Sequence, residues 1–130
     1  MIVVDASALL EALLHTSVGK AVRARLSAAP DALHVPHLLD LEVAHVLRRY
    51  AMNRLLDAER CRQALDDLSD FPLYRHPHDF LLPRIWQLRD NLSAYDGAYV
   101  ALAEMLDVPL VTCDRRLAGA SGHRARIDLV

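Results

Sequence analysis

Residues 2–14, IVVDASALLEALL, form a strand-to-helix junction that indicates the fold class. The first three are β-branched and apolar, which predicts a short buried strand over Ile2–Val4. Apolar residues then recur at helical spacing from Ala6 to Leu14. Asp5 stands between the two segments, where its carboxylate can cap the first turn of the helix. The junction predicts an α/β fold with Asp5 at the carboxyl end of the first strand.

The same alternation continues along the chain. Helical spacing and capping residues predict further helices over 18–28, 38–52, 58–68, 78–89 and 94–106, and apolar runs predict strands over 33–35, 71–74, 110–112 and 127–130. Pro30 is expected to end the second helix. Strands separated by helices favour parallel pairing with right-handed crossovers. We therefore predict one domain over residues 1–130, an α/β sandwich with a mainly parallel sheet of about five short strands flanked by helices.

Length and composition limit the possible classes of protein. A chain of 130 residues, 53 % apolar and 25 % charged, suits one globular domain. No apolar run approaches the ~18 residues that a membrane span needs, and the first residues lack the basic segment of a signal peptide. Since Cys61 and Cys113 lie far apart in sequence, we expect a cytoplasmic protein with reduced thiols. The formal net charge of −2 excludes nucleic-acid binding through a globally basic surface.

Four acidic residues occupy positions where an α/β fold gathers functional groups. Asp5 and Asp114 follow predicted strands, and Glu42 and Asp96 lie near the starts of predicted helices. Each alone is also explained as a helix cap or as a favourable charge at a helix N-terminus. Together they can face one rim of the sheet, where clustered carboxylates repel unless a cation neutralises them. Because carboxylates favour Mg²⁺ or Mn²⁺ over Zn²⁺, the set predicts a metal site that can activate water and neutralise a phosphoryl oxyanion.

Local sequences around these acids carry a resemblance to a known family. They are VDASAL at 4–9, LEV at 41–43, LSAYDGAYVALAE at 92–104 and VTCD at 111–114. In this order they resemble the PIN-domain ribonucleases, in particular the VapC-type toxins of bacterial toxin–antitoxin systems. The resemblance covers essentially the whole chain, and the segment from Tyr95 to Glu104 is its most specific part.

The resemblance implies a PIN-like three-layer sandwich and an endoribonuclease that depends on Mg²⁺, with Mn²⁺ as the alternative ion. It implies that Asp5 and Asp96 are the principal metal ligands, and that Glu42 and Asp114 act directly or through water. All four acids are then catalytic. The implied reaction is hydrolysis of an RNA phosphodiester by metal-activated water, which leaves a 5′-phosphate and a 3′-hydroxyl.

The resemblance also implies supporting residues and a partner. Ser7 and Thr112 match the small hydroxyl residues that hold the acids in place. The implied inhibitor is a cognate VapB-type antitoxin. An apolar surplus in the predicted helices over 6–14 and 38–47 predicts a groove for an antitoxin helix or an interface of a homodimer. The alternative is that these helices are simply buried on two sides.

Two adjacent arginines could bind RNA locally, although the chain carries a formal net charge of −2. Arg115 and Arg116 directly follow Asp114, and no acid occurs between them and Arg126. We predict that both position the phosphates next to the cleaved bond, because a guanidinium group matches phosphate geometry. The alternatives are a merely solvated surface and a second basic patch, formed by Arg48, Arg49 and Arg54.

Other functional classes fit the sequence less well. A receiver domain needs paired acids after the first strand and a late lysine, whereas the only lysine is Lys20. A phosphate-binding G-x-x-x-x-G-K-[ST] loop is absent, and a haloacid-dehalogenase-type phosphatase would need an acid in place of Ser7. The pair His76 and His78 lacks the further ligands of a zinc site. The remaining alternative is a non-catalytic PIN-like module that binds RNA or protein.

Overall fold

Short strands alternate with helices along the chain. The computed structural model describes residues 1–28 and 32–130. In order, the elements are β1 (Ile2–Val4), α1 (Ala6–Leu13), α2 (Ser17–Ser27), β2 (Leu33–Pro36), α3 (Leu38–Met52), α4 (Ala58–Asp70), β3 (Leu73–His76), the 3₁₀ turn η1 (Asp79–Leu81), α5 (Leu82–Gln87), α6 (Ala94–Leu106), β4 (Leu110–Thr112), α7 (Arg115–Ala118) and β5 (Ile127–Leu129). The predicted helix end at Pro30 lies outside the described residues. None of the helices in the described residues is both long and apolar enough to cross a membrane.

The strands form one parallel sheet in the order β3-β2-β1-β4-β5. All three residues of β1, at the centre of the sheet, are buried. A central strand of a parallel sheet is covered by helices on both faces, which explains its uninterrupted apolar run. The predicted α/β sandwich with a parallel five-stranded sheet is confirmed.

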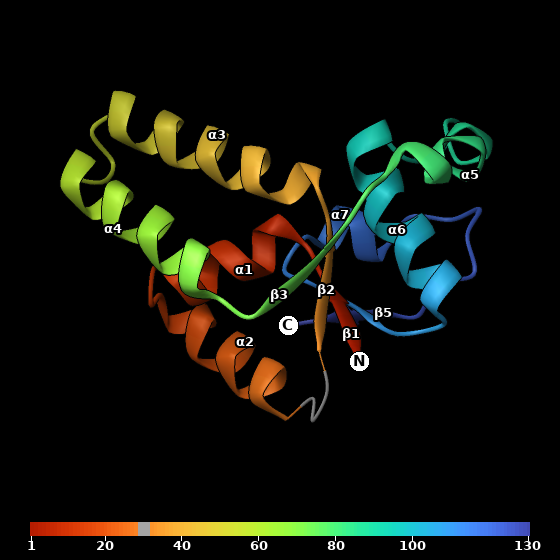
Figure 1. Cartoon of the computed structure of the whole chain (residues 1–130), viewed down its shortest axis with the longest axis horizontal. Coiled ribbons are helices and arrows are strands. Elements are labelled where there is room, and N and C mark those ends of the chain that lie inside the picture. Colours follow the sequence, from red (N-terminus) through yellow and green to blue (C-terminus); the bar gives the residue numbers. More distant parts are fainter. Residues whose placement is uncertain (29–31) are drawn as a thin grey trace.

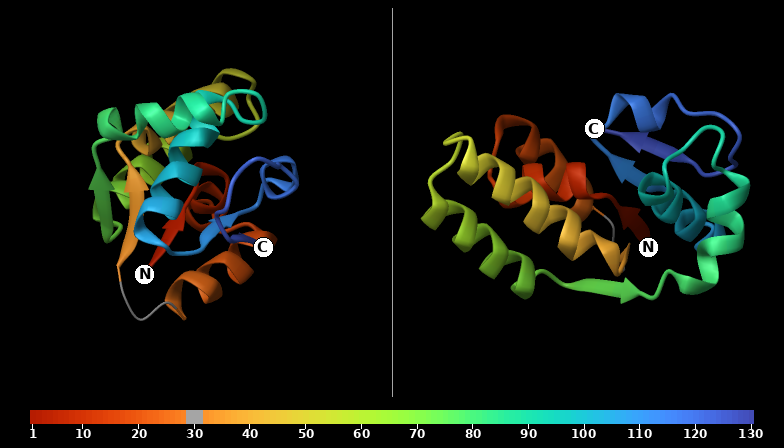
Figure 2. Two further views of the ribbon diagram at one scale, coloured as in Figure 1. Left: turned by 90° about the vertical axis from the view of Figure 1, so that its right-hand side faces the viewer. Right: turned by 90° about the horizontal axis from the view of Figure 1, so that it is seen from above.

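Helices cover both faces of this sheet. α6 packs against β1, β2 and β4, while α1 contacts β4 and is backed by α2. Figures 1 and 2 show the sheet between these two layers and the α3–α4 hairpin extending beyond it. Because parallel strands end at the same edge, the sheet brings the ends of β1 and β4 together, and with them Asp5 and Asp114.

One strand begins later than predicted. The strand expected over 71–74 starts at Leu73. Phe71 still donates its N–H to the Leu68 carbonyl at the end of α4, at 3.2 Å. Pro72 has no N–H to give to a neighbouring strand. Because Phe71 still bonds to the end of α4 and Pro72 has no N–H, β3 begins two residues later than predicted.

Two helical segments also differ from the predicted ones. The helix expected over 78–89 divides into η1 and α5, with Pro83 in the first turn of α5. A proline is accepted there because its missing N–H has no partner in a first turn. The short helix α7 was not among the segments predicted along the chain, although a helix after Asp114 was implied by the alternative explanation of this acid as a helix cap. It begins directly after Asp114, whose side chain accepts hydrogen bonds from the N–H groups of Arg116 and Leu117.

A buried carboxylate on α6 joins three segments of the chain. The Glu104 side chain is 2 % exposed and accepts hydrogen bonds from Arg84 Nε at 2.7 Å and Arg84 Nη2 at 3.0 Å. It also accepts the backbone N–H of Arg124 at 2.9 Å. The hydrogen bonds from Arg84 are the main reason that the pKa of Glu104 lies below its ordinary value. Glu104 thus clamps α5 and the loop after α7 onto α6.

We expect the Glu104→Gln variant to be less stable than the unmodified chain by about 1 kcal/mol at pH 7, because an amide cannot replace both charge-assisted bonds from Arg84. A lowered folded-state pKa stabilises the fold above the ordinary value of 4.5, and this stabilisation is lost as the pH falls through the folded-state pKa. Urea unfolding at pH 7 and at lower pH should show the difference shrinking. Glu59→Gln, in an exposed pair with Arg62, is the control and should change stability little. Equal losses in both variants would contradict the clamp.

Candidate active site

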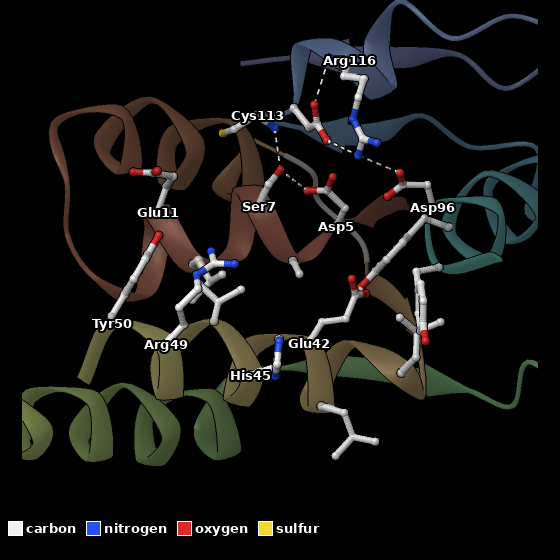
Figure 3. A pocket seen from close by; sticks show the side chains of 18 residues that line it. Asp5, Ser7, Glu11, Glu42, His45, Arg49, Tyr50, Asp96, Cys113 and Arg116 are labelled. Carbon is white, nitrogen blue, oxygen red and sulfur yellow. Dashed lines mark hydrogen bonds and ion pairs between the residues drawn. The ribbon is translucent and has the colours of Figure 1, made fainter. Parts of the chain in front are cut away.

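A pocket opens where β1 and β4 end. It has a volume of about 1030 Å³ and lies between α1, α3 and the first turns of α6 (Figure 3). In Figure 3 the side chains of Asp5, Glu42 and Asp96 point toward the same part of the pocket. Its lining includes all four acids predicted from the sequence, which are Asp5, Glu42, Asp96 and Asp114.

Asp5 is the most buried of these acids and is held on both oxygens. Its Oδ1 accepts the Ser7 hydroxyl at 2.7 Å and the Ala8 N–H at 3.0 Å, so that it caps α1. Its Oδ2 accepts the Thr112 hydroxyl at 2.5 Å. Burial raises the pKa of Asp5 above its ordinary value despite these hydrogen bonds, and the nearby charge of Asp96 raises it further.

The two hydroxyl residues also hold the segment after β4. Ser7 Oγ accepts the Cys113 N–H at 3.0 Å, and Thr112 Oγ1 accepts the Asp114 N–H at 2.9 Å. Ser7 Oγ and Thr112 Oγ1 are 3.2 Å apart and within hydrogen-bonding distance of each other, and Thr112 is fully buried. The ends of the two central strands are thereby joined around Asp5.

Glu42 lies on α3 and faces α6. The hydroxyl of the buried Tyr99 donates to Glu42 Oε1 at 2.6 Å. Burial is the largest cause of a raised pKa at Glu42, and the charges of Asp96 and Asp5 add to it. The sequence alone suggested no role for Tyr99. A signal was present, because Tyr99 follows Asp96 by three residues and so shares its face of the helix.

A single guanidinium group lies against the other two acids. Arg116 Nη2 is 3.1 Å from Asp96 Oδ2 and 3.3 Å from Asp114 Oδ2 (Figure 3). The pKa of Asp96 lies above its ordinary value. Burial is the largest cause, the charge of Arg116 partly opposes it, and the charge of Asp114 adds to it. The structure therefore distinguishes two arginines that the sequence presents as a pair. Arg116 lines the pocket, whereas Arg115 is exposed and is not among the lining residues.

The four carboxylates repel one another without converging on one point. Within residues 1–28 and 32–130, no three His, Cys, Asp or Glu side chains lie close enough to hold a metal ion in the observed arrangement. In this arrangement Tyr99 donates to Glu42, and Arg116 donates to Asp96 and Asp114. The donor set itself, made of carboxylate oxygens, suits a hard divalent cation. Arg116 would be the positively charged neighbour of an ion held by Asp96 and Asp114.

Away from the acids the pocket continues between α1 and α3. Figure 3 shows Arg49 and Tyr50 of α3 at this distant end, with Glu11 of α1 opposite them. Apolar residues line the stretch between the two ends, among them Leu10 and Val46. His45 of α3 lies between Glu42 and Arg49 in Figure 3, so the pocket is a groove with an acidic end, a middle that combines apolar side chains with His45, and a distant end of mixed charge.

Comparison with known proteins identifies the family. The PIN domain pattern matches residues 2–122. The chain belongs to the PIN-domain family. Among the curated relatives of this PIN domain, ribonuclease VapC9 of Mycobacterium tuberculosis is 47 % identical over 130 residues, which cover 100 % of this chain and 98 % of the relative. Ribonuclease VapC12 of the same organism is 42 % identical over 130 residues, which cover 100 % of this chain and 99 % of the relative.

Solved structures share the fold of this PIN domain. VapBC2 from Rickettsia felis, bound to a DNA fragment from its promoter, has a TM-score of 0.72 at 13 % identity and covers 100 % of this chain and 99 % of that chain. The Mycobacterium tuberculosis toxin VapC20, which cleaves the sarcin–ricin loop, has a TM-score of 0.69 at 14 % identity and covers 93 % of this chain and 97 % of that chain. At such identities the likeness establishes the fold, which is the PIN-like sandwich implied by the sequence.

Proposed function

We propose that this PIN domain is an endoribonuclease toxin, which hydrolyses RNA phosphodiester bonds and is neutralised by a cognate VapB-type antitoxin. The observation that carries the proposal is the presence of Asp5, Glu42, Asp96 and Asp114 in one pocket. Relatives that are 42–47 % identical over the whole chain are named ribonucleases, which supports RNA as the substrate.

The metal that we propose is Mg²⁺, with Mn²⁺ as the alternative. Asp5 and Asp96 are its principal ligands in this proposal, and Glu42 and Asp114 contribute directly or through water. Bound there, the cation would supply activation of water and neutralisation of charge on the phosphoryl oxygens. The raised pKa values of Asp5, Glu42 and Asp96 support it, because a cation would relieve the repulsion that contributes to them.

Other polar residues restrict the movement of these acids. Ser7 and Thr112 both donate to Asp5, and Tyr99 donates to Glu42. Such second contacts fix the direction of a carboxylate's free lone pairs. We assign Ser7, Thr112 and Tyr99 this positioning role. Arg115 and Arg116 remain the residues proposed to hold RNA phosphates beside the acids.

The groove between α1 and α3 is the site that we propose for the antitoxin. An amphipathic helix would place apolar side chains against Leu10, Leu38 and Val46, which line the groove. The acidic end would then attract a basic side chain of the same segment. The similarity of the fold to VapBC2 supports an antitoxin as the partner. A helix in this position would cover the carboxylates and exclude RNA.

Incubating the purified chain with a mixed RNA pool tests the function. With Mg²⁺ or Mn²⁺ we expect new RNA ends bearing 5′-phosphates, and we expect cleavage to stop with excess chelator or an equimolar cognate antitoxin. Mapping the 5′ ends would identify the target. RNA binding without cleavage in either ion would favour the non-catalytic module instead. An antitoxin that binds tightly yet leaves cleavage unchanged would contradict inhibition at this groove.

A further inference from the structure

Two large apolar side chains of the pocket are exposed to solvent, and each precedes a carboxylate in sequence. Leu41 precedes Glu42 on α3 and is 77 % exposed. Tyr95 precedes Asp96 on α6 and is 65 % exposed. Both side chains line the pocket that contains the four acids. The two elements thus repeat one arrangement, an exposed apolar residue followed by an acid.

Core packing does not account for this arrangement. α3 buries Leu39, Val43 and Leu47, and Leu41 lies outside that buried face. α6 buries residues 97–103, whereas Tyr95 lies in its first turn, before the buried stretch. Exposed apolar surface is unfavourable in water, and where it lines a groove it marks a surface that a ligand or partner covers.

We propose that Leu41 and Tyr95 form a seat for one nucleobase of single-stranded RNA, next to the phosphodiester that is cleaved. This inference rests on the proposed function. Every base has a π face that stacks on a tyrosine ring, and the aliphatic leucine adds a second apolar contact. Leu41 and Tyr95 line the same pocket as Glu42 and Asp96, so a nucleotide whose phosphate lies at these acids has its base inside the pocket that the two apolar side chains line.

The charges around the seat favour RNA over an apolar protein segment as its occupant. Glu42 follows Leu41 and Asp96 follows Tyr95 in sequence, and Arg116 contacts Asp96 from α7. A nucleotide suits both the charged and the apolar parts of the pocket. Its phosphate can contact Arg116 and the proposed metal ion, while its base covers Leu41 and Tyr95. Stacking tolerates any base, so the seat positions the strand rather than selecting its sequence.

A kinetic cycle between protein and RNA tests the seat. The substrate is a short single-stranded RNA that the pooled assay shows to be cleaved, together with copies that carry an abasic nucleotide at each position flanking the cleaved bond. We expect Tyr95→Ala to raise KM about tenfold, equivalent to about 1.4 kcal/mol, while kcat changes little. Tyr95→Phe should keep the KM of the unmodified chain, and Leu41→Ala should raise KM by a smaller factor.

The decisive result is the loss of base dependence. At one position the abasic nucleotide should lower kcat/KM of the unmodified chain by about the same tenfold, and it should not lower that of Tyr95→Ala further. Matched controls are Tyr74→Ala and Leu55→Ala, which remove side chains that are 64 % and 67 % exposed outside the pocket. Both controls should leave KM unchanged. Calorimetric Mn²⁺ affinity should also be unchanged in Tyr95→Ala.

Three results would overturn the seat. The first is an abasic penalty that is the same in Tyr95→Ala and the unmodified chain at every position. The second is an equal rise in KM in the controls. The third is a loss of antitoxin binding at unchanged KM, which would assign both residues to the antitoxin interface. An unmodified chain that cleaves no RNA would instead overturn the proposed function itself, and the seat with it.

Discussion

Replacing Asp96 with asparagine should lower both divalent-cation affinity and RNA cleavage by about a hundredfold, because the pocket loses one of its two principal proposed ligands. The substitution removes a charge and keeps the size of the side chain. It also keeps the bond from the backbone N–H of residue 96 to Ser93 Oγ, at 3.1 Å, which caps α6. The loss is therefore electrostatic rather than structural.

The Asp96→Asn variant should stay folded, with a melting temperature at pH 7 in chelator that equals or exceeds that of the unmodified chain. Burial and the charge of Asp114 raise the pKa of Asp96, so its charged form opposes folding at neutral pH. As the pH falls through this raised pKa, the unmodified chain also becomes protonated at Asp96. Any gain in the variant should then disappear.

Calorimetric titration with Mn²⁺ and cleavage of labelled RNA measure the two losses. Asp107→Asn is the matched control, because Asp107 is 94 % exposed at the end of α6 and has a positive φ that asparagine tolerates. It should retain both properties. Full activity of Asp96→Asn, or activity of the unmodified chain in excess chelator, would contradict a metal mechanism at this pocket.

Replacing Arg116 with alanine should tighten Mn²⁺ binding about tenfold in the absence of RNA. The guanidinium group contacts Asp96 and Asp114, and its positive charge would repel a cation held by the same two carboxylates. Its side chain is 76 % exposed, so it can leave the acids without disturbing the core. Once released it is free to hold a phosphate. The same substitution should therefore weaken RNA binding, and the slope of its salt dependence should fall by roughly 0.7 for each phosphate of a single strand that the variant no longer neutralises.

Arg115→Ala separates these two effects. Arg115 begins the same short helix but does not line the pocket, so its loss should leave Mn²⁺ affinity unchanged. If Arg115 holds RNA, the double variant should lose more salt dependence than Arg116→Ala alone. A double variant with an unchanged slope would show that neither residue binds RNA phosphate. The patch of Arg48, Arg49 and Arg54 would then be the better candidate.

Elements with strong local signals could be predicted closely. The strand over Ile2–Val4 and the helices over 38–52 and 94–106 have the predicted bounds. Apolar periodicity and a capping residue such as Ser93 act within one or two turns, so the sequence contains the whole signal. The segment from 71 to 89 was predicted less well, because its structure depends on where α4 ends and on the positions of Pro72 and Pro83.

The four acids could be expected at one edge of the sheet because a parallel sheet places all its strand ends there. The positions of the acids in the sequence could not show which other side chains donate hydrogen bonds to them. The bond between Tyr99 and Glu42 joins residues 57 positions apart, and those from Arg116 to Asp96 and from Arg84 to Glu104 each span 20. Such pairs form only when separate helices have packed, and no local pattern encodes the direction of a side chain at that stage.

The sequence by itself determined the alternation of strands and helices, the parallel sheet and the positions of the acids along the chain. These follow from periodicity, capping and the handedness of crossovers, which are properties of short segments. Tertiary structure alone decided that Arg116, and not Arg115, lies against Asp96 and Asp114, and that Leu41 and Tyr95 line the same pocket. Neighbours in sequence point in different directions from a helix, so only the packing of that helix decides which of them reaches the site.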